Sequence, residues 1–76
     1  MIKQDYKEFP KNEGQAFANY LIGKFLELRG LTYIKYEMQM VTGFNHRITF
    51  QDADKKDIVV VVYEDTKGHL HARIIK

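Results

Sequence analysis

Three histidines are the residues of this 76-residue chain best suited by type and spacing to do chemistry. His69 and His71 are two residues apart, so on a strand they project from one face. They could hold a metal ion together with a third ligand such as His46. Histidines at this spacing on an edge strand are more often surface residues, and we therefore predict no metal site.

A group of acidic residues superficially resembles a calcium-binding loop, namely Asp52, Asp54 and Asp57. The register does not fit, because Lys56 takes the third ligand position and Tyr63 replaces the terminal glutamate. The chain also contains no serine and no cysteine, so the usual hydrolase nucleophiles are missing, and it has no glycine-rich phosphate loop. We predict no catalytic residue, no cofactor and no enzymatic activity.

The central stretch Gln39–Gly43 is a candidate binding site. It lies between two segments in which apolar and polar residues alternate, and this pattern predicts two strands joined by a hairpin turn. Gly43 can supply a positive φ or a close backbone approach in that turn. Met40 and Val41 are apolar residues at its tip, which indicates a contact surface rather than a solvated loop.

The periodicity of the whole chain predicts one helix followed by four strands. The helix is expected over Glu13–Arg29, with Gly30 as the glycine that ends it and Gly23 allowing close approach to the sheet. Its inward stripe would consist of Phe17, Ala18, Tyr20, Leu21, Phe25 and Leu28. The expected strands are Thr32–Met40, Phe44–Phe50, Ile58–Tyr63 and His69–Ile75. We predict an α+β fold over residues 1–76, with the helix packed across one face of a four-stranded antiparallel sheet.

Alternation also assigns side chains to the two faces of the first long strand. Ile34, Tyr36 and Met38 are expected to share one face, and Tyr33 is expected on the other. Ahead of the helix, residues 2–6 are predicted either as a short edge strand or as a loosely held arm.

The composition is typical of a globular domain, with 45% hydrophobic residues and a net charge of +2. Such a small charge gives no strong basic field, so we do not expect nucleic acid as the partner. No apolar run is long enough to span a bilayer, and no secretory signal is visible at the start of the sequence. We expect a protein partner and favour a cytoplasmic location.

The central stretch resembles a motif of the cystatin family, which are proteinaceous inhibitors of papain-like cysteine proteases. Gln39, Val41 and Gly43 match the Q-x-V-x-G motif of that family. Asn45 and Ile48 match its G-x-N-x-x-I continuation. The motif follows a predicted helix and falls on the first long hairpin, where cystatins carry it.

This resemblance implies a cystatin-like fold and a mechanical form of inhibition. Cystatins block the protease cleft with a wedge of three pieces: an N-terminal segment, the Q-x-V-x-G hairpin and a second hairpin. By position these pieces would be Met1–Tyr6, Gln39–Gly43 and Thr66–His69. The predicted partner-binding residues are Gln39, Met40, Val41, Thr42, Gly43, Thr66, Lys67, Gly68 and His69.

The chain departs from the family in two of the three pieces. No glycine precedes Gly14, and Thr66-Lys67 stands where cystatins carry a Pro-Trp or Leu-Pro pair. The alternative is therefore a protein-interaction module on a cystatin-like fold that binds a protein other than a protease, such as a host factor.

A second resemblance is to the first half of a double-stranded-RNA-binding domain. It rests on Gly30-Leu31, Tyr36-Glu37 and the spacing Gly43-x-x-His46-x-x-x-Phe50. That family needs a C-terminal helix that opens with a Lys-Lys-x-x-Lys-like phosphate grip, whereas the end of this chain is predicted as strands. A helix over residues 60–75 would favour the RNA-binding alternative.

The cystatin resemblance also implies self-association by domain swapping. Cystatin-like chains have a hinge at this hairpin, and opening it exchanges the helix and first strand between two copies. Val41 and Thr42 are β-branched and disfavour tight-turn conformations. We therefore expect a domain-swapped homodimer to be accessible to this chain.

Overall fold

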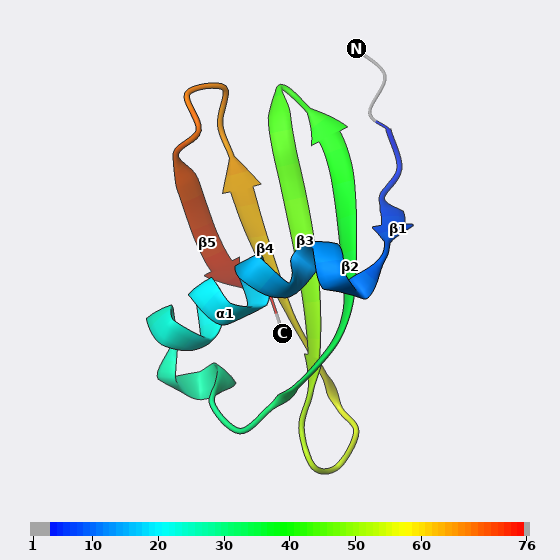
Figure 1. The fold of residues 1–76 in the computed structure, drawn as a ribbon, viewed down its shortest axis with the longest axis vertical. Helices are drawn as coiled ribbons and strands as arrows, with labels where there is room; N and C mark the ends of the chain where they lie inside the picture. The colour runs from blue at the N-terminus through cyan, green and yellow to red at the C-terminus, as the bar shows by residue number, and fades with distance from the viewer. Residues whose placement is uncertain (1–3, 76) are drawn as a thin grey trace.

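The computed structural model describes residues 4–75, which form one helix packed on a five-stranded antiparallel sheet (Figure 1). In chain order the elements are β1 (Lys7–Phe9), the 3-10 turn η1 (Lys11–Gly14), α1 (Gln15–Lys24), the 3-10 turn η2 (Leu26–Leu28), β2 (Thr32–Val41), β3 (Gly43–Gln51), β4 (Asp57–Glu64) and β5 (Leu70–Ile74). The strands lie side by side in the order of the sequence. The predicted α+β class is confirmed, and this arrangement is compatible with a cystatin-like fold.

The sheet has five strands rather than four because β1 joins the free side of β2, with Phe9 opposite Tyr36. The ring of Phe9 packs on that of Tyr36 at a centroid distance of 5.9 Å, which sets the position of this short strand. A strand over residues 2–6 was the alternative expected from the sequence. Residues 2 and 3 lie outside the described part of the chain, and residues 4–6 are not in a strand.

The predicted helix Glu13–Arg29 is too long at its C-terminal end. Phe25 is extended, with φ −117° and ψ 119°, and it separates α1 from η2. This break turns Leu28 back into the core, where it is fully buried, and leaves Leu26 72% exposed. Gly30 has a φ of +82°, but it lies in the connection to β2 rather than at the end of α1. Tyr20, which was expected on the inward stripe, is exposed.

A bulge in β2 changes which tyrosines reach the core. The pairing of β2 with β3 shifts register between Tyr33 and Lys35. One extra residue in a strand reverses the alternation beyond it, so Tyr33 and Tyr36 both lie buried on the helix side. The expectation that Tyr33 faces away from Tyr36 is therefore wrong.

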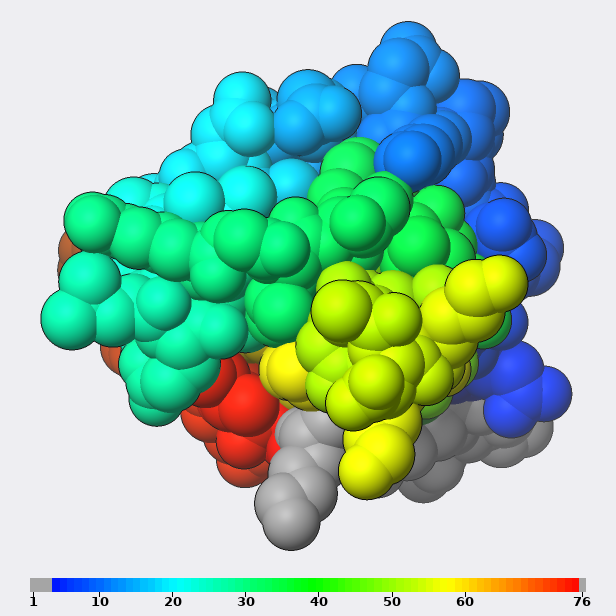
Figure 2. Space-filling model, turned by 90° about the horizontal axis from the view of Figure 1, so that it is seen from below, coloured from blue at the N-terminus to red at the C-terminus, as the bar shows by residue number. Residues whose placement is uncertain are grey.

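The core lies between α1 and the sheet. It consists of Ala18, Leu21, Leu28, Tyr33, Tyr36, Ile48, Phe50, Val60 and Val62. Viewed from the end that carries the β3–β4 connection, the helix forms one layer and the strands the other (Figure 2). Among residues 4–75, no helix packs against the opposite face of the sheet, which is called the outer face below (Figure 1).

Gly14 is the residue at which the helical segment comes closest to the sheet. A Cβ at this position would collide with the Tyr33 hydroxyl and with Cβ of Tyr36. Gly23, to which the sequence analysis gave this role, is exposed, and a Cβ there would have no atom within 4 Å. The close approach is thus made at the first glycine of the helical segment and not at the second.

This difference predicts opposite effects for the same substitution at two glycines. Gly14→Ala should lower the free energy of unfolding by about 1–3 kcal/mol, because the methyl group overfills a packed contact. Gly23→Ala should raise it by about 0.5 kcal/mol, because alanine is the better helix former and meets no neighbour. Urea denaturation of both variants measures the two changes. A Gly14→Ala protein as stable as the wild type would contradict the packing described here.

Candidate protein-binding site

The two hairpins that the sequence singles out end on the same side of the molecule (Figure 1). Phe44 lies opposite Met40 in β2 and opposite Glu64 in β4, and Glu64 lies opposite Leu70 in β5. The β2–β3 tip and the β4–β5 turn therefore project beyond the same end of the sheet. All predicted partner-binding residues lie at this end.

The β2–β3 tip is as tight as a hairpin can be, because Thr42 alone separates the two strands. Gly43 has a φ of +97°, and a Cβ on it would collide with the carbonyl oxygen of Glu64. Both roles expected of this glycine, a positive φ and a close backbone approach, are confirmed. Val41 and Thr42 have negative φ values, so neither lies in the left-handed region.

A tyrosine from β4 braces the tip from the side. The Tyr63 hydroxyl donates a hydrogen bond to the carbonyl oxygen of Thr42, with an O···O distance of 2.6 Å. Its ring lies beside Gly43, at the distance where a Cβ would begin to crowd it. The tip is thus fixed by a contact with the neighbouring hairpin as well as by its own strand pairing.

Gln39 connects the tip to the N-terminal segment. Its Nε2 donates to the carbonyl oxygen of Gln4 at 2.8 Å, and its Oε1 accepts from Nδ2 of Asn45 at 2.9 Å. Because both ends of the amide are used inside the molecule, Gln39 acts as an anchor between two of the three predicted wedge pieces. The exposed residues of the tip are Met40 and Thr42.

The apolar side chain that the tip offers most openly is that of Met40. It is 52% exposed, whereas Val41 is half-buried and Thr42 is exposed. A large apolar side chain exposed on a rigid tip suits an anchor residue for a partner's pocket.

The β4–β5 turn is ordered by one carboxylate. Asp65 Oδ1 accepts hydrogen bonds from the backbone N–H groups of Lys67 and His69, each at 2.9 Å. The N–H of His69, the side chain of His71 and the N–H of Lys67 together lower the pKa of the Asp65 carboxyl below its usual value. Gly68 has a φ of +84°, a conformation that glycine adopts readily in a turn. Thr66, Lys67, Gly68 and His69 are all exposed.

The three histidines do not come together. His69 and His71 both face Asp65, at N···O distances of 3.5 and 3.2 Å. His46 lies on the helix side of the sheet, opposite Val62, whereas His71 pairs with Tyr63 on the outer face. Within residues 4–75, no group of three histidine, aspartate or glutamate side chains is placed to hold a metal ion.

His46 instead belongs to a row of hydrogen-bonded side chains, called the polar chain below, that is formed by Tyr36, His46 and Glu64. The sequence did not indicate this arrangement. Its Nδ1 lies 2.7 Å from the Tyr36 hydroxyl, and its Nε2 lies 2.9 Å from Oε1 of Glu64. The ring is 4% exposed and stacks on Phe17 at a centroid distance of 4.1 Å. Desolvation by burial, with the nearby charges of Glu13 and Glu64, raises the pKa of the Tyr36 hydroxyl.

An imidazole with its hydrogen on Nε2 satisfies every member of this chain. It donates to Glu64 and accepts from Tyr36, and no buried side-chain polar atom within residues 4–75 lacks a partner. Alternation along each strand indicates which face of the sheet Tyr36, His46 and Glu64 occupy. Their contact with one another also depends on how β2, β3 and β4 are aligned, which alternation does not specify. The polar chain links the core to Glu64, which lies next to the tip.

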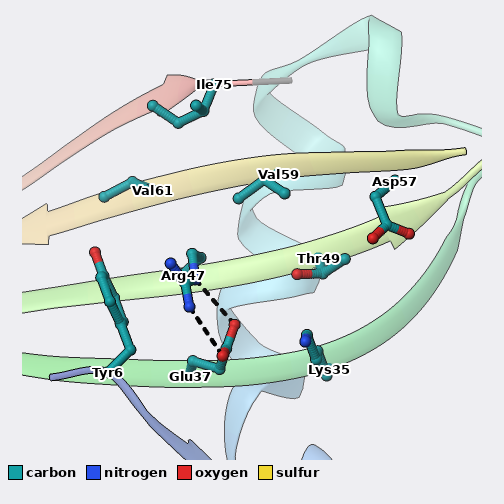
Figure 3. Close-up of a pocket in the computed structure, with 9 residues that line it drawn as sticks. All are labelled: Tyr6, Lys35, Glu37, Arg47, Thr49, Asp57, Val59, Val61 and Ile75. Carbon is teal, nitrogen blue, oxygen red and sulfur yellow. Dashed lines mark hydrogen bonds and ion pairs between the residues drawn. The ribbon is translucent and has the colours of Figure 1, made fainter.

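The outer face carries a shallow hollow of about 430 Å³ (Figure 3). At one side of it the Arg47 guanidinium donates two hydrogen bonds to Glu37, both at 2.9 Å, and lies 3.9 Å from the centre of the Tyr6 ring. Val59, Val61 and Ile75 line the other side. Arg47 and Glu37 are paired with each other, so neither offers an unpaired charge to a ligand in this hollow.

Comparison with protein families, with curated proteins and with solved structures finds no match for this chain. Within residues 4–75, no helix is long and apolar enough to cross a membrane.

The exposure of the tip predicts how its residues contribute to stability. Replacing both Met40 and Val41 with alanine should lower the free energy of unfolding by about 1 kcal/mol or less, because neither side chain is fully buried. Ile48→Ala, a buried control in the same hairpin, should cost about 2–5 kcal/mol through the cavity it leaves. Thermal melts of the two proteins test this, and an equally large loss in both would mean that the tip is part of the core.

The Arg47–Glu37 pair predicts a dependence of stability on pH. The hydrogen bonds from Arg47 lower the pKa of Glu37. Since that pKa is lower in the folded than in the unfolded protein, the stabilisation is present above the unfolded value of about 4.3 and is lost as the pH falls through the folded value. Glu37→Gln should therefore cost about 0.5–1 kcal/mol near pH 7, a modest value for a pair that is partly exposed, and very little near pH 2.

Urea denaturation at both pH values measures this difference, with Glu27→Gln, an exposed residue of η2, as the control. A Glu37→Gln variant with the same free energy of unfolding as the wild type at every pH would show that the pair contributes nothing to stability.

Proposed function

We propose that this protein is a protein-binding inhibitor that blocks the cleft of a papain-like cysteine protease with one end of its sheet. The inserted surface, called the wedge end below, consists of residues 4–6, Gln39–Gly43 and Thr66–His69. The observation that supports the proposal is the hydrogen-bonded link from Gln4 through Gln39 to Asn45, since it holds the N-terminal segment against the first tip, beside the second turn.

The physical form of the wedge end suits inhibition rather than catalysis. The first tip is held by the bond from Tyr63 to Thr42 and the second turn by Asp65, so neither loses much conformational freedom on binding. Met40 presents apolar area that a cleft can bury. A tip bent at Thr42 and paired on both sides does not offer an extended bond for cleavage, so the inhibitor should survive contact with the protease.

A second candidate function is a protein-interaction module for a partner other than a protease. The composition of the second turn favours it, because Thr66 and Lys67 are polar where cystatins carry bulky apolar residues. A polar second turn suits a partner surface that is less apolar than a protease cleft.

An RNA-binding function has lost its structural basis. The double-stranded-RNA-binding fold needs a C-terminal helix, and residues 57–64 and 70–74 are the strands β4 and β5. Duplex RNA binding that weakens steeply with salt would nevertheless bring this alternative back.

A titration of papain with this protein separates the two protein-binding functions. We expect loss of protease activity toward a small fluorogenic substrate, with the inhibitor recovered uncut by mass spectrometry. The double variant Met40→Ala, Val41→Ala should need more than tenfold higher concentration, because truncating a central apolar anchor costs about 2 kcal/mol.

The matched control is Leu26→Ala. Leu26 is more exposed than Met40 but lies on η2, away from the wedge end. The Leu26→Ala variant should inhibit papain like the wild type. Full protease activity at a large excess of wild-type protein would reject the protease target and leave the interaction module. Inhibition that is equally strong in the double variant would reject the wedge end as the inhibitory surface.

A further inference from the structure

The strand β5 forms one edge of the sheet, and among the described residues 4–75 it pairs only with β4. The opposite edge, β1, is three residues long, which makes it a poor template for another strand. β5 is five residues long and half-buried or exposed along its whole length. β5 is therefore the better of the two edges for pairing with a further strand.

The hydrogen bonds to β4 show which backbone groups of β5 are unused. The N–H of Ile75 donates to Val59 at 2.7 Å, and the N–H of Asp65 donates to His69 at 3.0 Å. Because bonding alternates along an antiparallel pair, His71 and Arg73 also direct their backbone groups toward β4. Leu70, Ala72 and Ile74 then direct theirs away from the sheet, where three N–H and three C=O groups stand ready for another strand.

The helix layer extends over the place that such a strand would occupy. α1 crosses the sheet toward β5, and its C-terminal end and η2 reach past that strand (Figure 1). Seen along the strands, the segment that follows α1 overlies the end of β5 (Figure 2). Leu26 on η2 is 72% exposed there. A hollow of about 370 Å³ lies nearby, lined in part by Ile58, Ile74 and Glu27.

The other side of the same edge carries the positively charged guanidinium of Arg73, next to His71. His71 and Arg73 project to the outer face and, with Val61 and Tyr63, line a hollow of about 300 Å³. Asp65 faces His71, but none of the ion pairs formed among residues 4–75 includes Arg73. An incoming strand therefore meets an apolar overhang on one side and basic groups on the other.

We propose that the β5 edge binds an extended segment of a partner protein in which apolar and acidic residues alternate. The segment adds a sixth strand through the free backbone groups of Leu70, Ala72 and Ile74. Its apolar side chains, opposite those three residues, lie on the helix side of the sheet, where the helix layer reaches the C-terminal end of β5 (Figure 1). Its acidic side chains lie opposite His71 and Arg73. This site does not depend on the protease proposed above, because it uses the edge of the sheet and not the wedge end.

A second copy of the chain fits this edge less well. Two β5 strands paired antiparallel about Ala72 would set His71 of one copy opposite Arg73 of the other. This pairing brings the two Arg73 guanidinium groups to the same seam with no acidic partner opposite either of them, and like charges opposite each other destabilise a strand pair whenever His71 is protonated. Charge complementarity thus favours an acidic segment over self-pairing.

The test uses two synthetic probes, acetyl-Val-Glu-Val-Glu-Val-amide and its Val-Lys counterpart, added to isotopically labelled protein and followed by NMR. The Glu peptide should shift the amide signals of Leu70, Ala72 and Ile74 and slow their hydrogen exchange. The amides of His71 and Arg73 are already bonded to β4 and should change less. The Glu peptide should bind several-fold more tightly than the Lys peptide, about fivefold for a favourable cross-strand charge pair.

Two variants sharpen the test. Ala72→Pro removes one outward N–H without removing a bond to β4, and proline is tolerated at such edge positions. It should weaken Glu-peptide binding at least tenfold. Arg73→Glu should reverse the preference in favour of the Lys peptide, and it tests the proposal even if Ala72→Pro does not fold. Met40→Ala, on β2 and separated from β5 by two strands, should bind both peptides like the wild type.

Three results would overturn the proposal. They are unchanged amide signals in β5 at millimolar Glu peptide, equal binding of the two peptides by the wild type, and protection of the same amides that grows with protein concentration when no peptide is present. The last result would identify the occupant as a second copy.

Discussion

The start of the helical segment can lie directly on β2 only because residue 14 has no side chain. Gly14 is buried, and the Tyr33 hydroxyl and Cβ of Tyr36 occupy the space that a Cβ would need. The hydrogen bond from Tyr33 to the carbonyl oxygen of Lys11, at 2.7 Å, closes the same contact from the other side. Since α1 begins at the next residue, this contact sets the line along which the helix crosses the sheet.

That contact also explains the bulge in β2. Tyr33 and Tyr36 are three residues apart, so regular alternation would send them to opposite faces. The register shift between Tyr33 and Lys35 brings both rings to the helix side, where both meet Gly14. The bulge and the glycine are therefore two parts of one packing solution, and neither is useful without the other.

From Tyr36 the influence of this contact reaches the wedge end. Tyr36 is hydrogen-bonded to His46, and His46 to Glu64, whose carbonyl oxygen lies against Gly43. A buried polar group that loses its partner costs about 1–3 kcal/mol, so a different register of β2, β3 or β4 would be penalised. The polar chain thus fixes how the three strands align, and with them the position of the tip relative to the β4–β5 turn.

The parts of this structure that could be predicted from sequence are those decided by local chemistry. Gly43 and Gly68 adopt the positive φ expected of turn glycines, and the unbroken valines of β4 lie in a strand whose core residues are fully buried. The end of α1 could not be predicted in this way, because the apolar period continues to Leu28. What separates Leu28 from the helix is the extended conformation of Phe25, which packs against the core and which the periodicity does not predict.

The candidate site also combines features that local sequence predicts with features that it does not. The sequence indicated an apolar tip, and Met40 is exposed there. It assigned Gln39 to the binding site, but it did not indicate the bond from the Gln39 side chain to Gln4, which crosses 35 positions of the chain. It offered His46 as a third ligand for His69 and His71, but strand parity places it on the other side of the sheet. Contacts of this kind depend on the register of several strands together, which no single segment encodes.

A domain of two layers has one sheet face that no other layer covers, and here that face is covered by its own side chains. Tyr6 lies over the Arg47 guanidinium, and Arg47 in turn is held by Glu37. Val61, beside Arg47 in the sheet, is only 8% exposed although it points away from the helix. These contacts cover part of the outer face and leave the shallow hollow beside them open. The groups that we propose to bind partners lie instead at the margins of the sheet. These are the apolar tip at one end of the sheet and the unpaired backbone groups along β5.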